Sequence, residues 1–226
     1  MEKIYNTVFP EKCIFCNKLG SSFCYKCLHE CQILNKGHCV VCDDISLFGV
    51  THYSCLKPGI PLACFSPFIY DGFVRECIKR SKFGPMLFAS LKHLTYEGLA
   101  FSSKVGFVVN KDVELVPIPL SKKRSKERGF NQSLIIANIC SKSWECKVSD
   151  KLLYRVKPTA LQADLSRKNR KLNLAGAFRA KGNTYNKKLL LIDDITTTGV
   201  TFLEAAKVLY AAGAEQVSCF ALSKKL

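Results

Sequence analysis

Two adjacent carboxylates, Asp193 and Asp194, stand between an apolar run and a loop of small hydroxyl residues. The run 189–192 has the apolar character of a buried parallel strand, and residues 202–212 have the composition of a helix. A loop between them offers backbone N–H groups, hydroxyls and a helix amino terminus to an anion. The carboxylates would then accept hydrogen bonds from a sugar diol while the loop holds the sugar's phosphate. The alternative is an ordinary strand–loop–helix unit with two solvated acids.

Residues 193–201, Asp-Asp-Ile-Thr-Thr-Thr-Gly-Val-Thr, resemble the loop that binds phosphoribosyl pyrophosphate (PRPP) in type I phosphoribosyltransferases. No Walker A or Gly-x-Gly-x-x-Gly motif competes with this match. In that family the acidic pair holds the ribose 2′ and 3′ hydroxyls, and the loop wraps the 5′-phosphate. The PRPP-binding residues that the resemblance implies are Asp193, Asp194, Thr196, Thr197, Thr198, Gly199 and Thr201.

Eight of the 13 cysteines lie in residues 1–55, most of them in pairs with two residues between. The paired residues are Cys13 and Cys16, Cys24 and Cys27, Cys39 and Cys42, and finally His52 and Cys55. Each pair can place two ligands on one tetrahedral ion, and two pairs complete a structural site, so we expect two structural zinc ions. A disulfide framework is the alternative, and it requires an oxidising compartment.

The grouping of these eight ligands is open between a sequential and a cross-braced arrangement. We favour the sequential one, because each half has its own turn residues, at 20–22 and at 43–44. Cys31 is left over. The later cysteines are expected to be buried as small apolar side chains, and they are Cys64, Cys77, Cys140, Cys146 and Cys219.

The net charge of +16 is concentrated in one part of the chain. Residues 120–190 hold 18 Lys and Arg against four acids, a net charge of +14. Such a positive field favours polyanions, among them PRPP and nucleic acid. The alternative is a solvated basic face without a partner.

The composition is that of a globular protein, with 48% apolar and 23% charged residues in a chain of 226. No run of 18 apolar residues indicates a transmembrane helix, so we expect no membrane insertion. The first ten residues have no long apolar stretch typical of a signal peptide, and a cytoplasmic location is therefore expected.

We expect three regions along the chain. Residues 1–57 form a metal module too small to fold well without its ions. Residues 58–110 form a helical linker region packed on the core, with a short strand at 65–70 and helices at 72–83 and 86–100. Residues 111–226 form the main domain.

In the main domain strands and helices alternate. Strands are expected at 113–117, 152–155, 177–179, 189–192 and 217–222, with a helix at 131–142 and a mobile basic loop at 156–172. The fold class is therefore α/β, a parallel sheet with helices on both faces and ligands at the carboxyl ends of its strands.

Several separated motifs resemble the ComF family of ComFC type. They are Val-Pro-Ile-Pro-Leu at 116–120, Arg-x-x-x-Arg-Gly-Phe-Asn-Gln at 124–132, Arg-x-x-Pro-Thr-x-x-Gln at 155–162, and Arg-x-x-Asn at 170–173 with Ala-Phe at 177–178. Tyr-Asp-Gly at 70–72, followed by Lys-Phe at 82–83, also resembles this family. The family joins an N-terminal double zinc ribbon to a type I phosphoribosyltransferase-like domain. One departure is His52, where the family usually has cysteine.

The resemblance implies a role in natural competence, in handling single-stranded DNA, with components of the DNA-uptake machinery as partners. It also implies PRPP binding with Mg²⁺ bridging pyrophosphate and diol oxygens. Relatives contact pyrophosphate with the loop after the first core strand, here residues 120–124, and cover the site with a loop equivalent to 156–167. The candidate basic groups for the leaving group and this hood are Lys122, Lys123, Arg124, Arg128 and Arg155.

The acceptor of any transferred phosphoribosyl group is not indicated. All four histidines precede residue 111, so a general base would be a carboxylate or the substrate itself. Three hypotheses remain: a ComF-type competence protein with or without phosphoribosyl transfer, a phosphoribosyltransferase of nucleotide metabolism or salvage, and a non-catalytic zinc-ribbon DNA-binding module. The zinc ribbons and basic segment favour the first, and the intact acidic pair disfavours the third.

Overall fold

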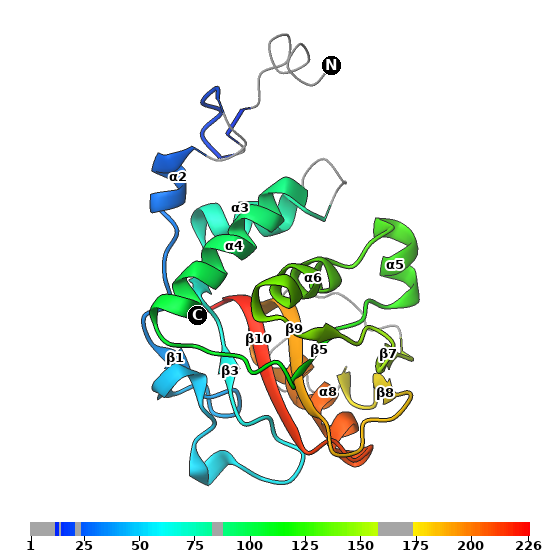
Figure 1. Cartoon of the computed structure of the whole chain (residues 1–226). Helices are drawn as coiled ribbons and strands as arrows, with labels where there is room; N and C mark the ends of the chain where they lie inside the picture. Colours follow the sequence, from blue (N-terminus) through cyan, green and yellow to red (C-terminus); the bar gives the residue numbers. More distant parts are fainter. Residues whose placement is uncertain (1–11, 14, 21–23, 83–87, 158–173) are drawn as a thin grey trace.

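The computed structural model describes residues 12–13, 15–20, 24–82, 88–157 and 174–226. Its centre is a parallel sheet in the order β3-β10-β9-β5-β6, with β4 pairing further along β10 (Figure 1). The strands are β3 (Cys64–Phe65), β4 (Phe68–Ile69), β5 (Glu114–Pro117), β6 (Lys147–Val148), β9 (Lys188–Thr196) and β10 (Gln216–Lys224). Every pair in this sheet is parallel.

The central strands are buried on both faces. Along β9, Leu190 and Ile192 join one apolar layer, while Leu189 and Leu191 join the other. Helices α3 (Gly72–Arg80), α4 (Phe88–Lys104) and α6 (Gln132–Trp144) lie on the first face, and α8 (Val200–Ala211) lies on the second (Figure 1). This arrangement confirms the predicted α/β class with helices on both faces.

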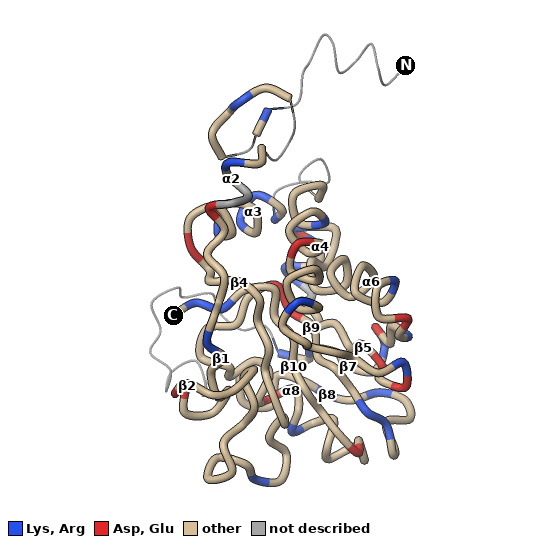
Figure 2. Tube along the Cα trace, turned by 60° about the vertical axis from the view of Figure 1, so that its left-hand side comes forward, with Lys and Arg blue, Asp and Glu red and all other residues tan. Residues whose placement is uncertain are grey.

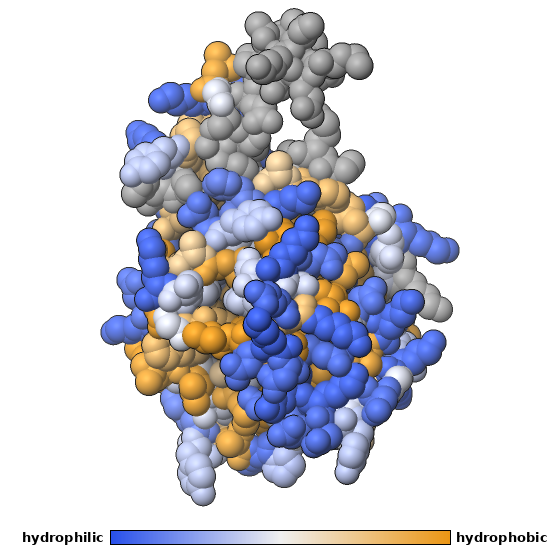
Figure 3. All heavy atoms as spheres, viewed as in Figure 1, coloured by the Kyte–Doolittle hydropathy of each residue, from blue (hydrophilic) through white to orange (hydrophobic). Residues whose placement is uncertain are grey.

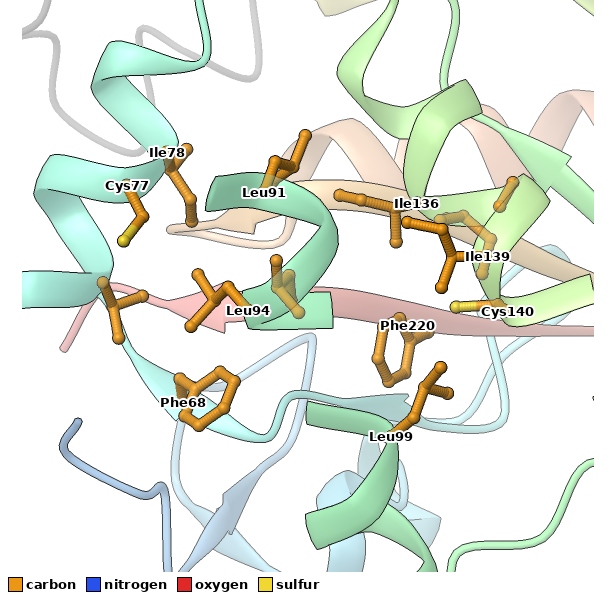
Figure 4. Packing of buried hydrophobic residues seen from close by; sticks show 14 of the residues in the cluster. Phe68, Cys77, Ile78, Leu91, Leu94, Leu99, Ile136, Ile139, Cys140 and Phe220 are labelled. Carbon is orange, nitrogen blue, oxygen red and sulfur yellow. The ribbon is translucent and has the colours of Figure 1, made fainter. Parts of the chain in front are cut away.

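One apolar layer joins the early helices to the sheet. Side chains of α3, α4, α6 and β10 meet in it, with Leu99 and Ile139 near Phe220 (Figure 4). The predicted apolar face of α3 is buried at Phe73, Val74, Cys77 and Ile78. The predicted helix over 72–83 ends at Arg80, and the start of the one predicted over 86–100 lies outside the described residues.

The strand predicted at 152–155 forms, but it does not join the parallel sheet. It is β7 (Leu153–Arg155), and it pairs antiparallel with β8 (Phe178–Ala180) as a separate two-stranded sheet. The main sheet ends instead at β6. This strand has only two residues and was therefore too short to be predicted from the sequence. Residues 158–173, most of the predicted basic loop, lie outside the described part of the chain.

Strand β9 is longer than predicted and continues through Thr196, so the acidic pair lies inside the strand. The pyrophosphate-contacting loop was expected at residues 120–124, but from residue 122 the chain forms helix α5 (Lys122–Arg128). Ser121 caps this helix, its side chain accepting a hydrogen bond from the Arg124 amide at 3.4 Å. The basic side chains of this segment are therefore spaced by helical geometry.

The N-terminal module consists of short elements: α2 (Tyr25–His29), β1 (Gly37–His38), β2 (Ile45–Ser46), η1 (Leu47–Gly49) and η2 (Tyr53–Cys55). Phe15 packs edge-on against Phe73 of α3, with ring centroids 5.8 Å apart. Residues 58–110 contribute β3 and β4 to the main sheet as well as α3 and α4, and the proposed boundaries at 57 and 110 stay a prediction. Within the described ranges, no helix has both the length and the apolar character needed to cross a bilayer.

Candidate functional site

The acidic pair lies near the carboxyl end of β9, where parallel α/β sheets bind ligands. Asp193 Oδ1 accepts hydrogen bonds from Ser133 Oγ at 2.8 Å and from the Asp194 amide at 2.9 Å. Burial and the neighbouring charge of Asp194 nevertheless raise the pKa of Asp193 to about 8. The ligand-free site therefore favours the protonated form of Asp193 more than water does.

Three cationic side chains from separate elements approach this pair. Lys82 Nζ, just after α3, lies 3.5 Å from Asp194 Oδ2. Arg124 of α5 interacts electrostatically with both carboxylates, and Arg155 of β7 interacts with Asp193 and with Arg124. Burial and the neighbouring Arg128 lower the pKa of Arg124, and burial and Arg124 lower that of Arg155. Two crowded guanidinium groups next to a pair of carboxylates suit a polyanionic ligand.

The other predicted basic residues are placed less centrally. Arg128 donates from NH1 to Gln132 Oε1 at 3.2 Å, at the start of α6. Lys123 forms an exposed ion pair with Glu127 at 3.9 Å. The side chain of Lys122 lies outside the described part of the structure. The structure thus brings Arg124 and Arg155, among the five predicted basic residues, into electrostatic contact with the acidic pair.

The threonine-rich loop joins β9 to α8 as predicted. Gly199 takes a left-handed conformation (φ 72°) at the N-cap of α8. Among the described residues no side chain caps this helix, so its first amides remain available to an anion. Asp193, Leu174 and residues 195–202 enclose a small cavity of about 50 Å³. The loop is thereby shaped as a compact backbone cradle.

The second strand–helix turn of the site is fixed by Asn131. Its Oδ1 accepts from the Ser133 amide at 3.1 Å, and its Nδ2 donates to the Ile118 carbonyl at 3.0 Å. Asn131 thus caps α6 and ties it to the end of β5. This capping holds Ser133 in position to donate to Asp193.

The eight predicted metal ligands form two groups in which all ligand atoms lie within 4.8 Å of one another. The groups are Cys13, Cys16, Cys24 and Cys27, and then Cys39, Cys42, His52 and Cys55. This grouping matches the sequential arrangement. Four sulfurs, or three sulfurs and an imidazole, at tetrahedral spacing fit zinc and leave no open position for substrate. Two cysteine-rich sites that can hold zinc are therefore present.

In each group, backbone amide hydrogen bonds favour the thiolate form of one cysteine, the form that binds a cation. Although burial raises the pKa of Cys13, amides of Cys16, Cys24 and Phe15 lower it to about 6 overall. Amides around Cys39 likewise outweigh burial and lower its pKa to about 7. His52 Nδ1 lies 3.3 Å from Cys42 Sγ, and its Nε2 lies 3.1 Å from the Ile45 carbonyl, which orients the ring. The five later cysteines are buried, as predicted.

The second metal group lies directly against the threonine-rich loop. Val40, between two of its ligands, contacts Gly199, where an added Cβ would be 2.6 Å from the Val40 carbonyl oxygen. Lys224 Nζ, only 8% exposed, lies 2.5 Å from Asp43 Oδ1 and 3.4 Å from the Thr197 carbonyl. The Lys225 amide donates to the Thr196 carbonyl at 2.9 Å. The end of β10 therefore connects the metal group to the loop.

Sequence reasoning missed Ser133, Lys82 and Lys224 as members of this site. Ser133 follows the Arg-Gly-Phe-Asn-Gln motif directly, and Lys82 stands in the quoted Lys-Phe pair, so both had a signal in the family resemblance. Lys224 had none, because nothing in the local sequence links the last strand to Asp43.

No protein-family profile matches the chain. Several curated proteins are similar to it, and three of them illustrate the range. "DNA utilization protein YhgH" of Escherichia coli K12 is 35% identical over 112 residues, covering 50% of this chain and 49% of that protein. "Competence protein F" of Haemophilus influenzae is 32% identical over 113 residues, 49% of each. "Competence protein ComFC" of Bacillus subtilis is 29% identical over 227 residues, 93% of this chain and 88% of that protein.

The chain thus spans about half the length of YhgH and competence protein F and most of the length of ComFC. Among solved structures, a phosphoribosylpyrophosphate synthetase from Mycobacterium smegmatis matches 59% of this chain and 33% of its own. Its TM-score is 0.29 and its identity 15%.

Proposed function

We propose that this chain, which is similar to the competence protein ComFC over most of its length, is a ComF-type competence protein that binds PRPP and handles single-stranded DNA. The observation that carries the PRPP proposal is the paired Asp193 and Asp194, which lie near the carboxyl end of β9 and interact with Lys82, Arg124 and Arg155. The carboxylates would bind the ribose diol, the backbone of the threonine-rich loop would bind the 5′-phosphate, and the guanidinium groups would bind the pyrophosphate.

Each part of PRPP has a separate set of proposed partners. Asp193 and Asp194 accept hydrogen bonds from the ribose 2′ and 3′ hydroxyls. The amides at the start of α8 and the hydroxyls of residues 196–201 hold the 5′-phosphate. Arg124 and Arg155 hold the pyrophosphate, with Lys122, Lys123 and Arg128 as further candidates. Mg²⁺ bound with PRPP would neutralise part of the pyrophosphate charge.

Phosphoribosyl transfer at this site would break the bond between ribose C1 and pyrophosphate. Positive charge then develops on the ribose ring and negative charge on the leaving group. The guanidinium groups stabilise the departing pyrophosphate, and the carboxylates stabilise the ring through its hydroxyls. Residues 111–226 contain no histidine, so the acceptor must supply its own nucleophile or use a carboxylate base.

The DNA part of the proposal rests on two separate supports. Proteins named for competence and for DNA utilization are similar to this chain in sequence. The segment 120–190 carries a net charge of +14, which favours a polyanion much larger than PRPP. The two metal groups would hold structural zinc, and a cytoplasmic location with DNA-uptake partners completes the proposed role.

PRPP binding is tested by thermal unfolding with and without PRPP and Mg²⁺. We expect PRPP to raise the melting temperature of the wild type, and the double substitution of Asp193→Asn and Asp194→Asn to abolish this shift. Asp150→Asn, an exposed acid in the same basic segment, should keep it. Ribose 5-phosphate and pyrophosphate as separate ligands distinguish sugar recognition from plain anion binding. No shift in the wild type would remove the PRPP proposal.

Turnover is a separate question with its own assay. Pyrophosphate release from PRPP is measured against a panel of nucleobases, amines and oligonucleotides. Release that depends on one acceptor and on Asp194 would establish a transferase, and release with a free nucleobase would favour a role in nucleotide salvage. Binding without release would indicate that PRPP acts as a ligand only.

A further inference from the structure

The hairpin of β7 and β8 has an inner and an outer face. Leu153 and Phe178 point inward and are buried in the layer that contains α8. On the other side lie Tyr154 of β7 and Val156 just after it, each 43% exposed, and Arg179 of β8 and Lys181 just after it, which are also exposed. Side chains two residues apart share a face of a strand, so these four form one surface.

The register of the hairpin places Tyr154 directly opposite Arg179. Directly paired residues have Cβ atoms about 5 Å apart, so Tyr154 and Arg179 project from neighbouring positions on the outer face. Lys181 lies two residues after Arg179, just past the end of β8. An exposed aromatic ring next to cations is the combination that stacks a base and holds its phosphates.

The cations of this surface form no ion pair with an acid among the described residues, although Arg179 Nη1 donates a hydrogen bond to the Phe178 carbonyl at 2.9 Å. Lys187 and Lys188, which follow in sequence, form ion pairs with Glu114 at 2.9 Å and Asp112 at 2.8 Å. Over the described residues no ion pair engages Lys151, Arg179 or Lys181. Basic residues lie along the trace near β7 and β8 (Figure 2), and hydrophilic side chains gather over this part of the molecule (Figure 3).

The inner face of the same hairpin leads to the acidic pair. Arg155, between Tyr154 and Val156, has its guanidinium carbon 5.5 Å from the centre of the Phe178 ring and interacts with Asp193. One three-residue strand therefore presents a tyrosine outward and a site arginine inward. A ligand on the outer face would therefore lie on the opposite side of β7 from Arg155, one of the PRPP-binding candidates.

We propose that the outer face of the β7–β8 hairpin binds single-stranded nucleic acid, with one base stacked on Tyr154 and backbone phosphates on Arg179 and Lys181. The inference rests on the proposed DNA handling and gives it a location, but it does not depend on PRPP binding. An aromatic ring beside two cations favours a nucleotide over a peptide side chain, because a nucleotide brings both a base that stacks and a phosphate that pairs with the cations.

The test is fluorescence anisotropy with a labelled oligothymidylate. Because stacking on an aromatic residue contributes about 1–3 kcal/mol per base, Tyr154→Ala should weaken binding by about 5- to 150-fold, and Tyr154→Phe should bind like the wild type. Tyr96→Ala is the matched control, since Tyr96 is similarly exposed (51%) but lies on α4. An abasic oligonucleotide of the same length should remove the difference between Tyr154→Ala and the wild type.

The phosphate contacts are tested by salt dependence. Arg179→Gln and Lys181→Gln should each reduce the slope of log affinity against log salt by about 0.7, the value for one phosphate of a single strand. Equal binding by wild type and all three variants would overturn the proposed location while leaving DNA binding intact. An absence of wild-type binding would overturn both, and equal competition by polyglutamate would show general polyanion attraction instead of stacking.

Discussion

Gly199 of the threonine-rich loop and Val40 of the second metal group are in backbone contact. A Cβ on Gly199 would lie 2.6 Å from the Val40 carbonyl oxygen and 2.7 Å from Val40 Cγ2. The φ of Gly199 is also 72°, in the left-handed region that favours glycine. The contact makes the metal module part of the support of the proposed phosphate cradle.

Gly199→Ala should therefore weaken PRPP binding at least about tenfold and destabilise the fold by ~1–3 kcal/mol, through backbone strain and displacement of the loop from Val40. Isothermal titration with PRPP and Mg²⁺ measures the first effect, and urea unfolding measures the second. Gly106→Ala is the matched control, because Gly106 has a similar φ of 78° but nothing within 4 Å of an added Cβ. Equal losses in both variants would show that backbone strain alone is responsible.

Lys224→Met tests the second link between these parts. The substitution keeps the apolar stem of the side chain but removes the bonds to Asp43 and to the Thr197 carbonyl. We expect PRPP affinity to fall about 5- to 20-fold with a stability loss of ~1 kcal/mol, since Asp43 is half exposed and regains water. Lys225→Met, at the exposed neighbour, should leave both unchanged. Unchanged affinity in Lys224→Met would show that the loop needs no support from β10.

Selective loss of each metal group gives a third prediction. Cys42→Ser should reduce zinc content from about two ions to about one and abolish the thermal shift with PRPP, because the second group supports the loop. Cys16→Ser should cause the same loss of zinc but keep the PRPP shift. Its group packs on α3, through Phe15 and Phe73. Metal analysis verifies each loss, and a PRPP shift retained in Cys42→Ser would contradict the proposed support.

The sequence revealed the parts of the site that are contiguous. Asp193, Asp194 and the residues that follow form one local strand–loop–helix unit, and the spacing of the cysteine pairs is local as well. Ser133 lies 60 residues from Asp193 and Lys224 lies 181 from Asp43, so their bonds depend on how the sheet brings strands together. The same limit explains β7, whose three residues read as a strand without showing that its partner would be β8.

Asp193→Asn should stabilise the protein while it removes PRPP binding. The pKa of Asp193 is about 8 in the folded state, against an ordinary value of 3.8, so between these values the folded protein binds one more proton than the unfolded chain. The free energy of unfolding therefore falls as pH rises through this window. Asparagine keeps the oxygen that accepts from Ser133 and from the Asp194 amide but carries no charge.

We expect the free energy of unfolding of Asp193→Asn to exceed that of the wild type by ~2–3 kcal/mol at pH 9. Each unit of pKa shift corresponds to about 1.4 kcal/mol, and relaxation around a partly accessible carboxylate reduces the total. The difference should shrink toward pH 5. Urea unfolding at pH 5, 7 and 9 measures it. Asp112→Asn is the opposite control, since the Lys188 ammonium lowers the pKa of Asp112. Removing the charge of Asp112 should therefore not stabilise the protein. A pH-independent loss of stability in Asp193→Asn would show that Asp193 is ionised and satisfied in the ligand-free site.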